Sequence, residues 1–101
     1  MNNLTHLLDQ LRSLRGVTVH PWVFTASHQT FQLWLARSQQ PDLFLTMGEC
    51  HSVSFVEGWH LNQLTIEQVP GMTPERLLVR DGDYLRVECE RVFLSETGLT
   101  P

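Results

Sequence analysis

Cysteine and histidine are the residues of this sequence with the most possible chemical roles, because they can bind metal ions or serve as nucleophile and base. The chain has 101 residues with two cysteines and five histidines, and Cys50, His51, His60 and Cys89 are the metal-ligand candidates. Zinc sites bring their ligands in close pairs such as C-x2-C or H-x3-H. No such pair occurs here, and neighbours on an extended strand, such as Cys50 and His51, point to opposite faces. We therefore expect no metal ion and no other cofactor.

The sequence also shows no nucleophile placed beside a base, as covalent catalysis requires. A cysteine nucleophile needs a base within hydrogen-bond reach, and a regular strand directs His51 away from Cys50. The dipeptide Ser27-His28 lacks the G-x-S-x-G context of a serine hydrolase. We therefore expect no catalytic residues.

Charge and glycine patterns argue against nucleic acids and nucleotides as partners. Seven arginines, no lysine and eleven acidic residues give a net charge of -4. Such a chain lacks the basic footprint that nucleic-acid binding requires, although the tryptophans offer stacking surfaces for a single strand. The six glycines are dispersed at expected turns and form no phosphate-binding loop. Glu88 and Glu90, which share a strand face, are explained as a salt-linked outer surface with the arginines beside them.

Ring-bearing side chains are the best candidates for a binding site. Trp34 lies between Leu33 and Leu35 in an expected strand, so it must face away from them and from the core. The helix or a second subunit could then cover it. The residues that we expect to contact a partner or ligand are His20, Trp22, Trp34, Trp59 and His60.

One helix is predicted near residues 3–15. Five leucines recur there at helical spacing and form one stripe, which must lie against the rest of the chain or a partner. Asn2 or Asn3 can cap the first turn, and Gly16 supplies a left-handed stop. The leucines of the stripe are Leu4, Leu7, Leu8, Leu11 and Leu14.

The apolar period changes from 3.6 to 2 after Gly16, which predicts a β-rich region over residues 17–95. Its turn signals divide it into about six strands. The order of elements favours an α+β fold in which the N-terminal helix packs on a mainly antiparallel sheet, in a single domain over residues 1–101. A small β-barrel with one helix is the alternative.

The clearest hairpin is predicted around Asp81-Gly82. A three-residue loop there places Val79 opposite Leu85 and asks for a positive φ angle near Gly82. The parity of apolar residues then switches near Glu90, where we expect a β-bulge.

Localisation and function are the broadest expectations. The sequence begins without a secretory pattern and has no apolar run that could span a bilayer, so Cys50 and Cys89 are expected to be free, buried thiols of a cytosolic protein. We expect a non-catalytic protein that acts by protein contact, as a homodimer or as an inhibitor or immunity-type subunit. The alternative is a small-ligand-binding or hydrolytic protein with a pocket formed by His20, Trp22, Trp59 and His60.

Overall fold

The structure is a computed structural model that describes residues 3–25, 29–71 and 75–98. Within these ranges, one helix is followed by nine strands. Their bounds are α1 Asn3–Arg12, β1 Thr18–Thr25, β2 Thr30–Ala36, β3 Leu43–Gly48, β4 Ser52–Phe55, β5 Trp59–His60, β6 Leu64–Val69, β7 Arg76–Asp81, β8 Leu85–Cys89 and β9 Arg91–Ser95.

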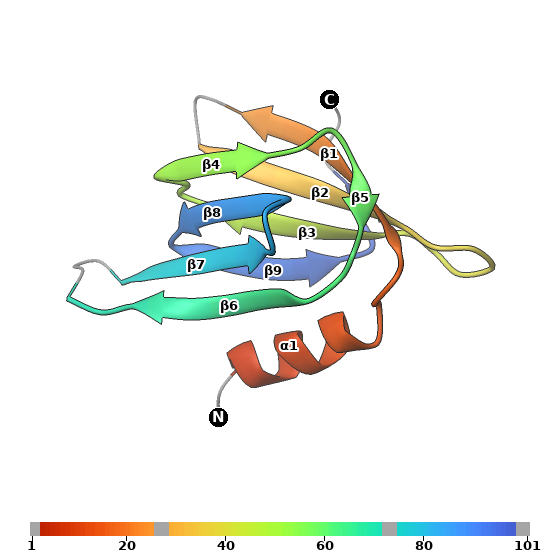
Figure 1. Ribbon diagram of the computed structural model, residues 1–101, viewed down its shortest axis with the longest axis horizontal. Helices are drawn as coiled ribbons and strands as arrows, with labels where there is room; N and C mark the ends of the chain where they lie inside the picture. The colour runs from red at the N-terminus through yellow and green to blue at the C-terminus, as the bar shows by residue number, and fades with distance from the viewer. Residues whose placement is uncertain (1–2, 26–28, 72–74, 99–101) are drawn as a thin grey trace.

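The strands form two antiparallel sheets that face each other (Figure 1). The first sheet has five strands in the order β5-β1-β2-β3-β9, and the second has four in the order β4-β8-β7-β6. Neither sheet closes on itself, so the α+β prediction with an antiparallel arrangement is confirmed and the barrel alternative is not adopted. The strands number nine rather than about six, because they include the two-residue β5 and because β8 and β9 belong to different sheets.

The hydrophobic core lies between the sheets. Because successive side chains of a strand point to opposite faces, every second side chain points toward the core. Those that are fully buried include Leu33, Leu35 and Leu45 of the first sheet and Val79 and Val87 of the second. The opposite faces of both sheets point outward.

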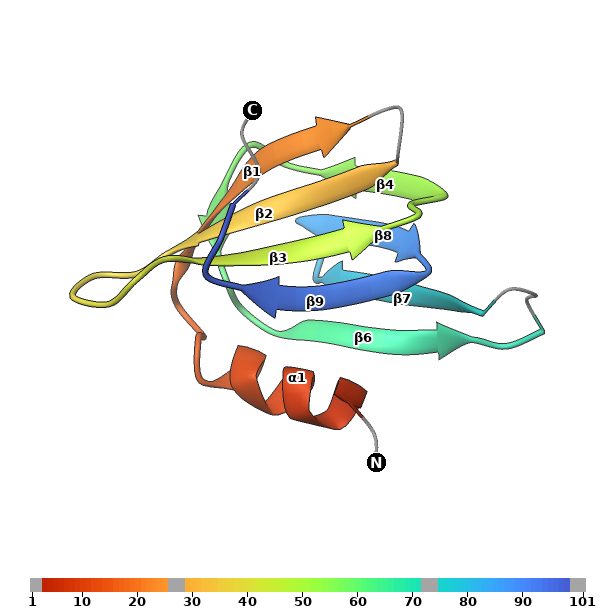
Figure 2. The ribbon, with the colours of Figure 1, turned by 180° about the vertical axis from the view of Figure 1, so that it is seen from behind.

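Helix α1 runs along the side of the two-layer structure where β6 and β9 lie (Figure 2). Leu7, Leu11 and Leu14 are buried and Leu8 packs against the core, as the leucine stripe predicts. The helix ends at Arg12 rather than near residue 15. The chain then continues in turns, with Gly16 at a φ of 91°, which confirms the expected left-handed stop. The expected cap at Asn2 and the side chains of Asn3 and Leu4 lie outside the described part of the structure.

The β7–β8 hairpin has a register two residues away from the predicted one. Asp81 lies opposite Leu85 and Val79 lies opposite Val87, with Gly82 at a φ of 55° in the turn. The prediction failed because it placed Asp81 in the turn. The structure keeps Asp81 in the strand, where it is completely buried.

The chain passes from the second sheet to the first at Glu90. The backbone N–H of Glu90 donates to Gly48 O at 3.0 Å, and Arg91 then begins pairing with β3. The switch in apolar parity therefore marks a change of sheet rather than the predicted bulge. An irregularity of register occurs instead in β1, between Pro21 and Val23.

Candidate functional site

The outward side of the five-stranded sheet carries a group of aromatic rings. His20 lies opposite Trp34 across β1 and β2, and Trp34 lies opposite Phe44 across β2 and β3. The ring centroids of His20 and Trp34 are 5.1 Å apart, and the Trp22 ring lies 5.5 Å from Trp34 and 6.1 Å from Phe44. All four side chains are half-buried. Together with Phe93 of β9, which is 52% exposed, they are named here the outer aromatic face.

The position of Trp34 agrees with its predicted orientation. Leu33 and Leu35 have no exposed surface, whereas Trp34 lies on the opposite side of the same strand. Phe44 follows the same rule between Leu43 and Leu45. Trp22 joins this side at the irregularity in β1, where Pro21 and Val23 pair with consecutive residues of β2.

Polar contacts hold the face in place. The indole Nε1 of Trp34 donates to Asp42 Oδ2 at 2.9 Å, and the backbone N–H of Arg37 donates to Asp42 Oδ1 at 3.0 Å. These two hydrogen bonds, that from Arg37 first, lower the pKa of Asp42 below its ordinary value. Gln32 and Thr46, also on this side, are buried and joined by a hydrogen bond of 2.9 Å.

Part of the face is covered by the chain that follows β9. A Cβ atom at Gly98 would lie 2.7 Å from two carbon atoms of the Phe44 ring, so the backbone rests directly on that ring. Figure 2 shows this segment turning back across the five-stranded sheet. The expectation that helix α1 could cover Trp34 is wrong, because α1 lies along the β6 side instead.

Trp59 belongs to a separate, buried arrangement. Its indole Nε1 donates to Asp81 Oδ2 at 2.8 Å, and only 7% of the residue is exposed. The backbone N–H groups of Asn62 and Gln63 also donate to the Asp81 carboxylate, at 3.1 and 2.9 Å. This carboxylate therefore joins β7 to the chain between β5 and β6. The Trp59 ring also stacks on Tyr84 at 6.2 Å.

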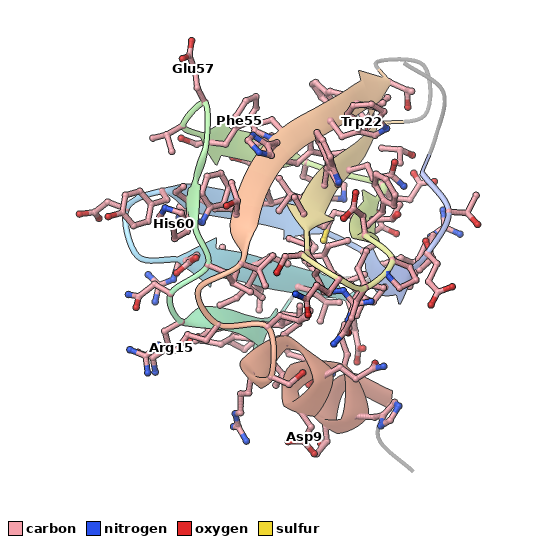
Figure 3. The ribbon with its side chains drawn as sticks, turned by 90° about the vertical axis from the view of Figure 1, so that its right-hand side faces the viewer. Asp9, Arg15, Trp22, Phe55, Glu57 and His60 are labelled. Atoms are coloured by element: carbon pink, nitrogen blue, oxygen red, sulfur yellow. The ribbon has the colours of Figure 1, made fainter. Side chains whose placement is uncertain are left out.

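The predicted site residues thus fall into two groups. His20, Trp22 and Trp34 are together on the outer aromatic face, whereas Trp59 and His60 line a cavity of about 570 Å³ beside β5. His20 and Trp22 do not line that cavity. Figure 3 shows Trp22 and His60 on different sides of the molecule.

The two cysteines are free and buried, as expected. Burial raises the pKa of both thiols, and that of Cys89 reaches about 12. The Cys50 thiol donates to Met47 O at 3.2 Å, while the neighbouring His51 Nε2 lies 2.8 Å from Glu90 Oε2. Within the described ranges, no three histidine, cysteine or acidic side chains gather in a way that could hold a metal ion.

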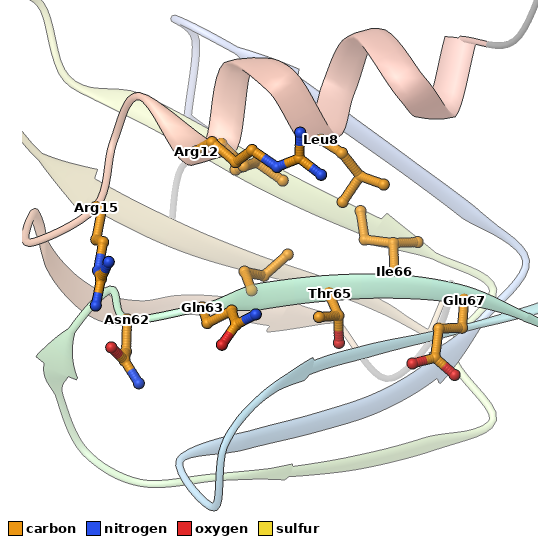
Figure 4. Close-up of a pocket in the computed structure, with 10 residues that line it drawn as sticks. Leu8, Arg12, Arg15, Asn62, Gln63, Thr65, Ile66 and Glu67 are labelled. Carbon is orange, nitrogen blue, oxygen red and sulfur yellow. The ribbon is translucent and has the colours of Figure 1, made fainter.

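A groove of about 550 Å³ separates α1 from β6 (Figure 4). Leu8 and Ile66 face each other across it, and its rim carries Arg12, Arg15 and Glu67. The groove is lined by no histidine or cysteine. We interpret it as the seam where the helix meets the edge of the second sheet.

The sequence interpretation missed four residues that matter to these arrangements. Phe44 could have been found, because it alternates with Leu43 and Leu45 as Trp34 does with its neighbours. Phe93 could have been found in the same way, because it lies between Val92 and Leu94. The roles of Asp42 and Asp81 depend on contacts with other segments of the chain, for which the sequence carries no local signal.

Comparison with known protein families, with curated proteins and with solved structures gives no match. Among the residues that the structure describes, no helix has the length and apolar character needed to cross a bilayer.

Proposed function

We propose that this protein is a non-catalytic binding protein that acts in the cytosol by contact with another protein, through the outer aromatic face. The gathering of His20, Trp22, Trp34 and Phe44 on the side away from the core is the observation that carries the proposal. Large aromatic side chains are enriched at protein interfaces, where they offer wide contact area.

These four rings do not pack in the hydrophobic core. Leucine and valine side chains, together with Phe31 and Trp59, fill the space between the sheets, whereas the four rings of this group lie on the opposite side of the five-stranded sheet. The hydrogen bond from Trp34 to Asp42 holds the indole in one orientation before a partner binds, so less conformational entropy is lost on binding. A partner that presents an apolar surface fits this face, and an inhibitor or immunity-type subunit would act through such a contact.

Two free thiols support the cytosol as the compartment. Cys50 and Cys89 are both buried, and they do not form a disulfide bond with each other. Reduced cysteines of this kind are usual where glutathione and thioredoxin keep thiols reduced.

Site-specific cross-linking in the cells of origin tests the proposal. A photoreactive phenylalanine analogue replaces Trp22 in one variant and Thr65, which is on the outer side of the second sheet, in the control. We expect one discrete protein adduct from position 22 and none from position 65.

A second substitution, Phe93→Glu, places a charge on the same face at a residue that is 52% exposed, so folding is retained. It should reduce the yield of the adduct by about tenfold or more. The proposal is wrong if position 22 gives no adduct, if both positions give the same adducts, or if Phe93→Glu leaves the yield unchanged.

A further inference from the structure

Strand β4 is an outer strand of the four-stranded sheet, and it differs from the other edges of the molecule. Helix α1 runs beside β6 and β9, and β5 has only two residues. Strand β4 has no described helix or strand on its outer side. Proteins usually protect such edges with charged residues or proline. The sequence Ser52-Val53-Ser54-Phe55 contains neither.

The register of β4 shows which of its backbone groups face outward. Ser54 lies opposite Arg86, and the N–H of Val56 donates to Tyr84 O at 3.0 Å in the same ladder. Hydrogen-bonding positions alternate along an antiparallel strand. The backbone N–H and C=O groups of Val53 and Phe55 therefore point away from β8, toward the open side.

Apolar side chains lie beside this edge. The Phe55 ring turns inward and stacks on Phe31 at 4.8 Å, yet Phe55 remains 44% exposed, because none of the described strands lies beyond it. Val56 is 39% exposed, and Phe24 of β1, which contacts the same Phe31 ring, is 54% exposed. Figure 3 shows Phe55 in the space between β4 and β1. Phe24 and Phe55, joined through the Phe31 ring, thus leave apolar surface exposed beside this edge, as interaction surfaces do.

We propose that two copies of this chain associate through β4, pairing antiparallel about a two-fold axis at Ser54 to form one continuous eight-stranded sheet. In this register Val53 of one copy lies opposite Phe55 of the other, and the outward N–H and C=O groups of both residues are satisfied. The pairing is self-complementary, as a two-fold interface requires.

Side-chain chemistry favours a second copy as the occupant. Valine opposite phenylalanine is a favourable cross-strand pair on the inner side. On the outer side, Ser54 of one copy meets Ser54 of the other, so no like charges face each other. The inference concerns a different surface from the outer aromatic face and stands independently of the proposed function.

The test uses charge at the two-fold axis. Ser54→Glu places a carboxylate opposite Arg86 of its own sheet, which favours the folded monomer, but it puts two carboxylates directly opposite each other in the dimer. Ser52→Arg is the matched control: its new charge lies opposite Glu88 of its own sheet and opposite the neutral Val56 of the second copy.

Sedimentation velocity over a range of protein concentrations measures the association. The shared ladder is short, so we expect the wild-type protein to dimerise with a dissociation constant on the order of 10–100 μM. Ser54→Glu should weaken dimerisation by about tenfold or more, whereas Ser52→Arg should change it by less than about threefold. An equimolar mixture of Ser54→Glu and Ser54→Arg chains should restore a dimer.

The inference is overturned if the wild-type chain stays monomeric up to about 1 mM. It is also overturned if a dimer forms but responds equally to Ser54→Glu and Ser52→Arg, because the interface would then lie elsewhere. Circular dichroism confirms that each variant is folded before its association is measured.

Discussion

At the scale of single residues, the buried side chain of Asp81 joins two parts of the fold that are distant in sequence. Its carboxylate has no exposed surface and accepts hydrogen bonds from Trp59 Nε1 and from two backbone N–H groups. Burying a carboxylate is costly unless such donors surround it. The Asp-Gly motif predicts that Asp81 lies in the turn. In the structure Asp81 instead ends β7 and links this strand to the chain that leads into β6.

Asp81→Ala should destabilise the protein by about 3 kcal/mol, because it leaves one buried and two partly buried donors without their acceptor. Trp59→Phe removes one donor to the carboxylate and also reduces the volume of a buried ring, so it should cost about 2 kcal/mol. Urea denaturation followed by circular dichroism measures both free energies of unfolding.

The matched control is Asp83→Ala, in the same turn but exposed, which should change stability by less than about 0.5 kcal/mol. Equal effects of Asp81→Ala and Asp83→Ala would contradict the role assigned to the buried carboxylate.

At the scale of elements, the connection between β2 and β3 positions the outer aromatic face. Asp42 accepts hydrogen bonds from the Arg37 backbone and from the Trp34 ring, so one carboxylate both closes the connection and orients an indole. Both bonds favour the ionised carboxylate, which explains the lowered pKa of Asp42.

Asp42→Asn should lower the melting temperature at neutral pH, because the amide cannot reproduce two charge-assisted bonds. A lowered pKa in the folded state means that the stabilisation is present above the ordinary value of 3.8 and is lost as the pH falls through the folded-state value. The difference between wild type and variant should therefore shrink steadily below pH 3.8. Calorimetry from pH 7 down to about pH 2.5 measures it, with Asp83→Asn as the exposed control.

Local patterns predicted some elements well and others poorly. The helix follows from leucine spacing, and the outward direction of Trp34 follows from alternation with Leu33 and Leu35, because both depend on neighbours in sequence. The passage of the chain between sheets at Glu90 could not be predicted. A bulge within one sheet and a change of sheet produce the same switch in apolar parity.

At the scale of the whole molecule, the edges of the two sheets are covered on one side of the structure and open on the other. Helix α1 shields the side of β6 and β9, whereas β4 is left open on the other. The aromatic residues predicted as one candidate set are divided by the same architecture, since the β5 segment turns Trp59 inward while β1 and β2 carry Trp22 and Trp34 outward. Sequence cannot predict that division, because it depends on which strands share a sheet.

Leu11→Ala should destabilise the protein by about 3 kcal/mol, because Leu11 is only 3% exposed and its loss leaves a cavity under α1. The adjacent exposed residue provides the control, and Gln10→Ala should have an effect below about 0.5 kcal/mol. Thermal and urea denaturation measure both. If the two substitutions cost the same, α1 is not a packed part of the core.

The pairing of β9 with β3 bears on how the chain folds during its synthesis. One edge of β3 pairs with the neighbouring β2, but its other edge pairs Phe44–Gly48 with Arg91–Ser95, so a long stretch must be made before this second ladder can form. Ladders between distant segments form slowly, since the entropy of the intervening chain is lost first. On the ribosome, one edge of β3 stays bare until Ser95 has emerged, and nascent chains of this protein should therefore depend on holding chaperones up to that point.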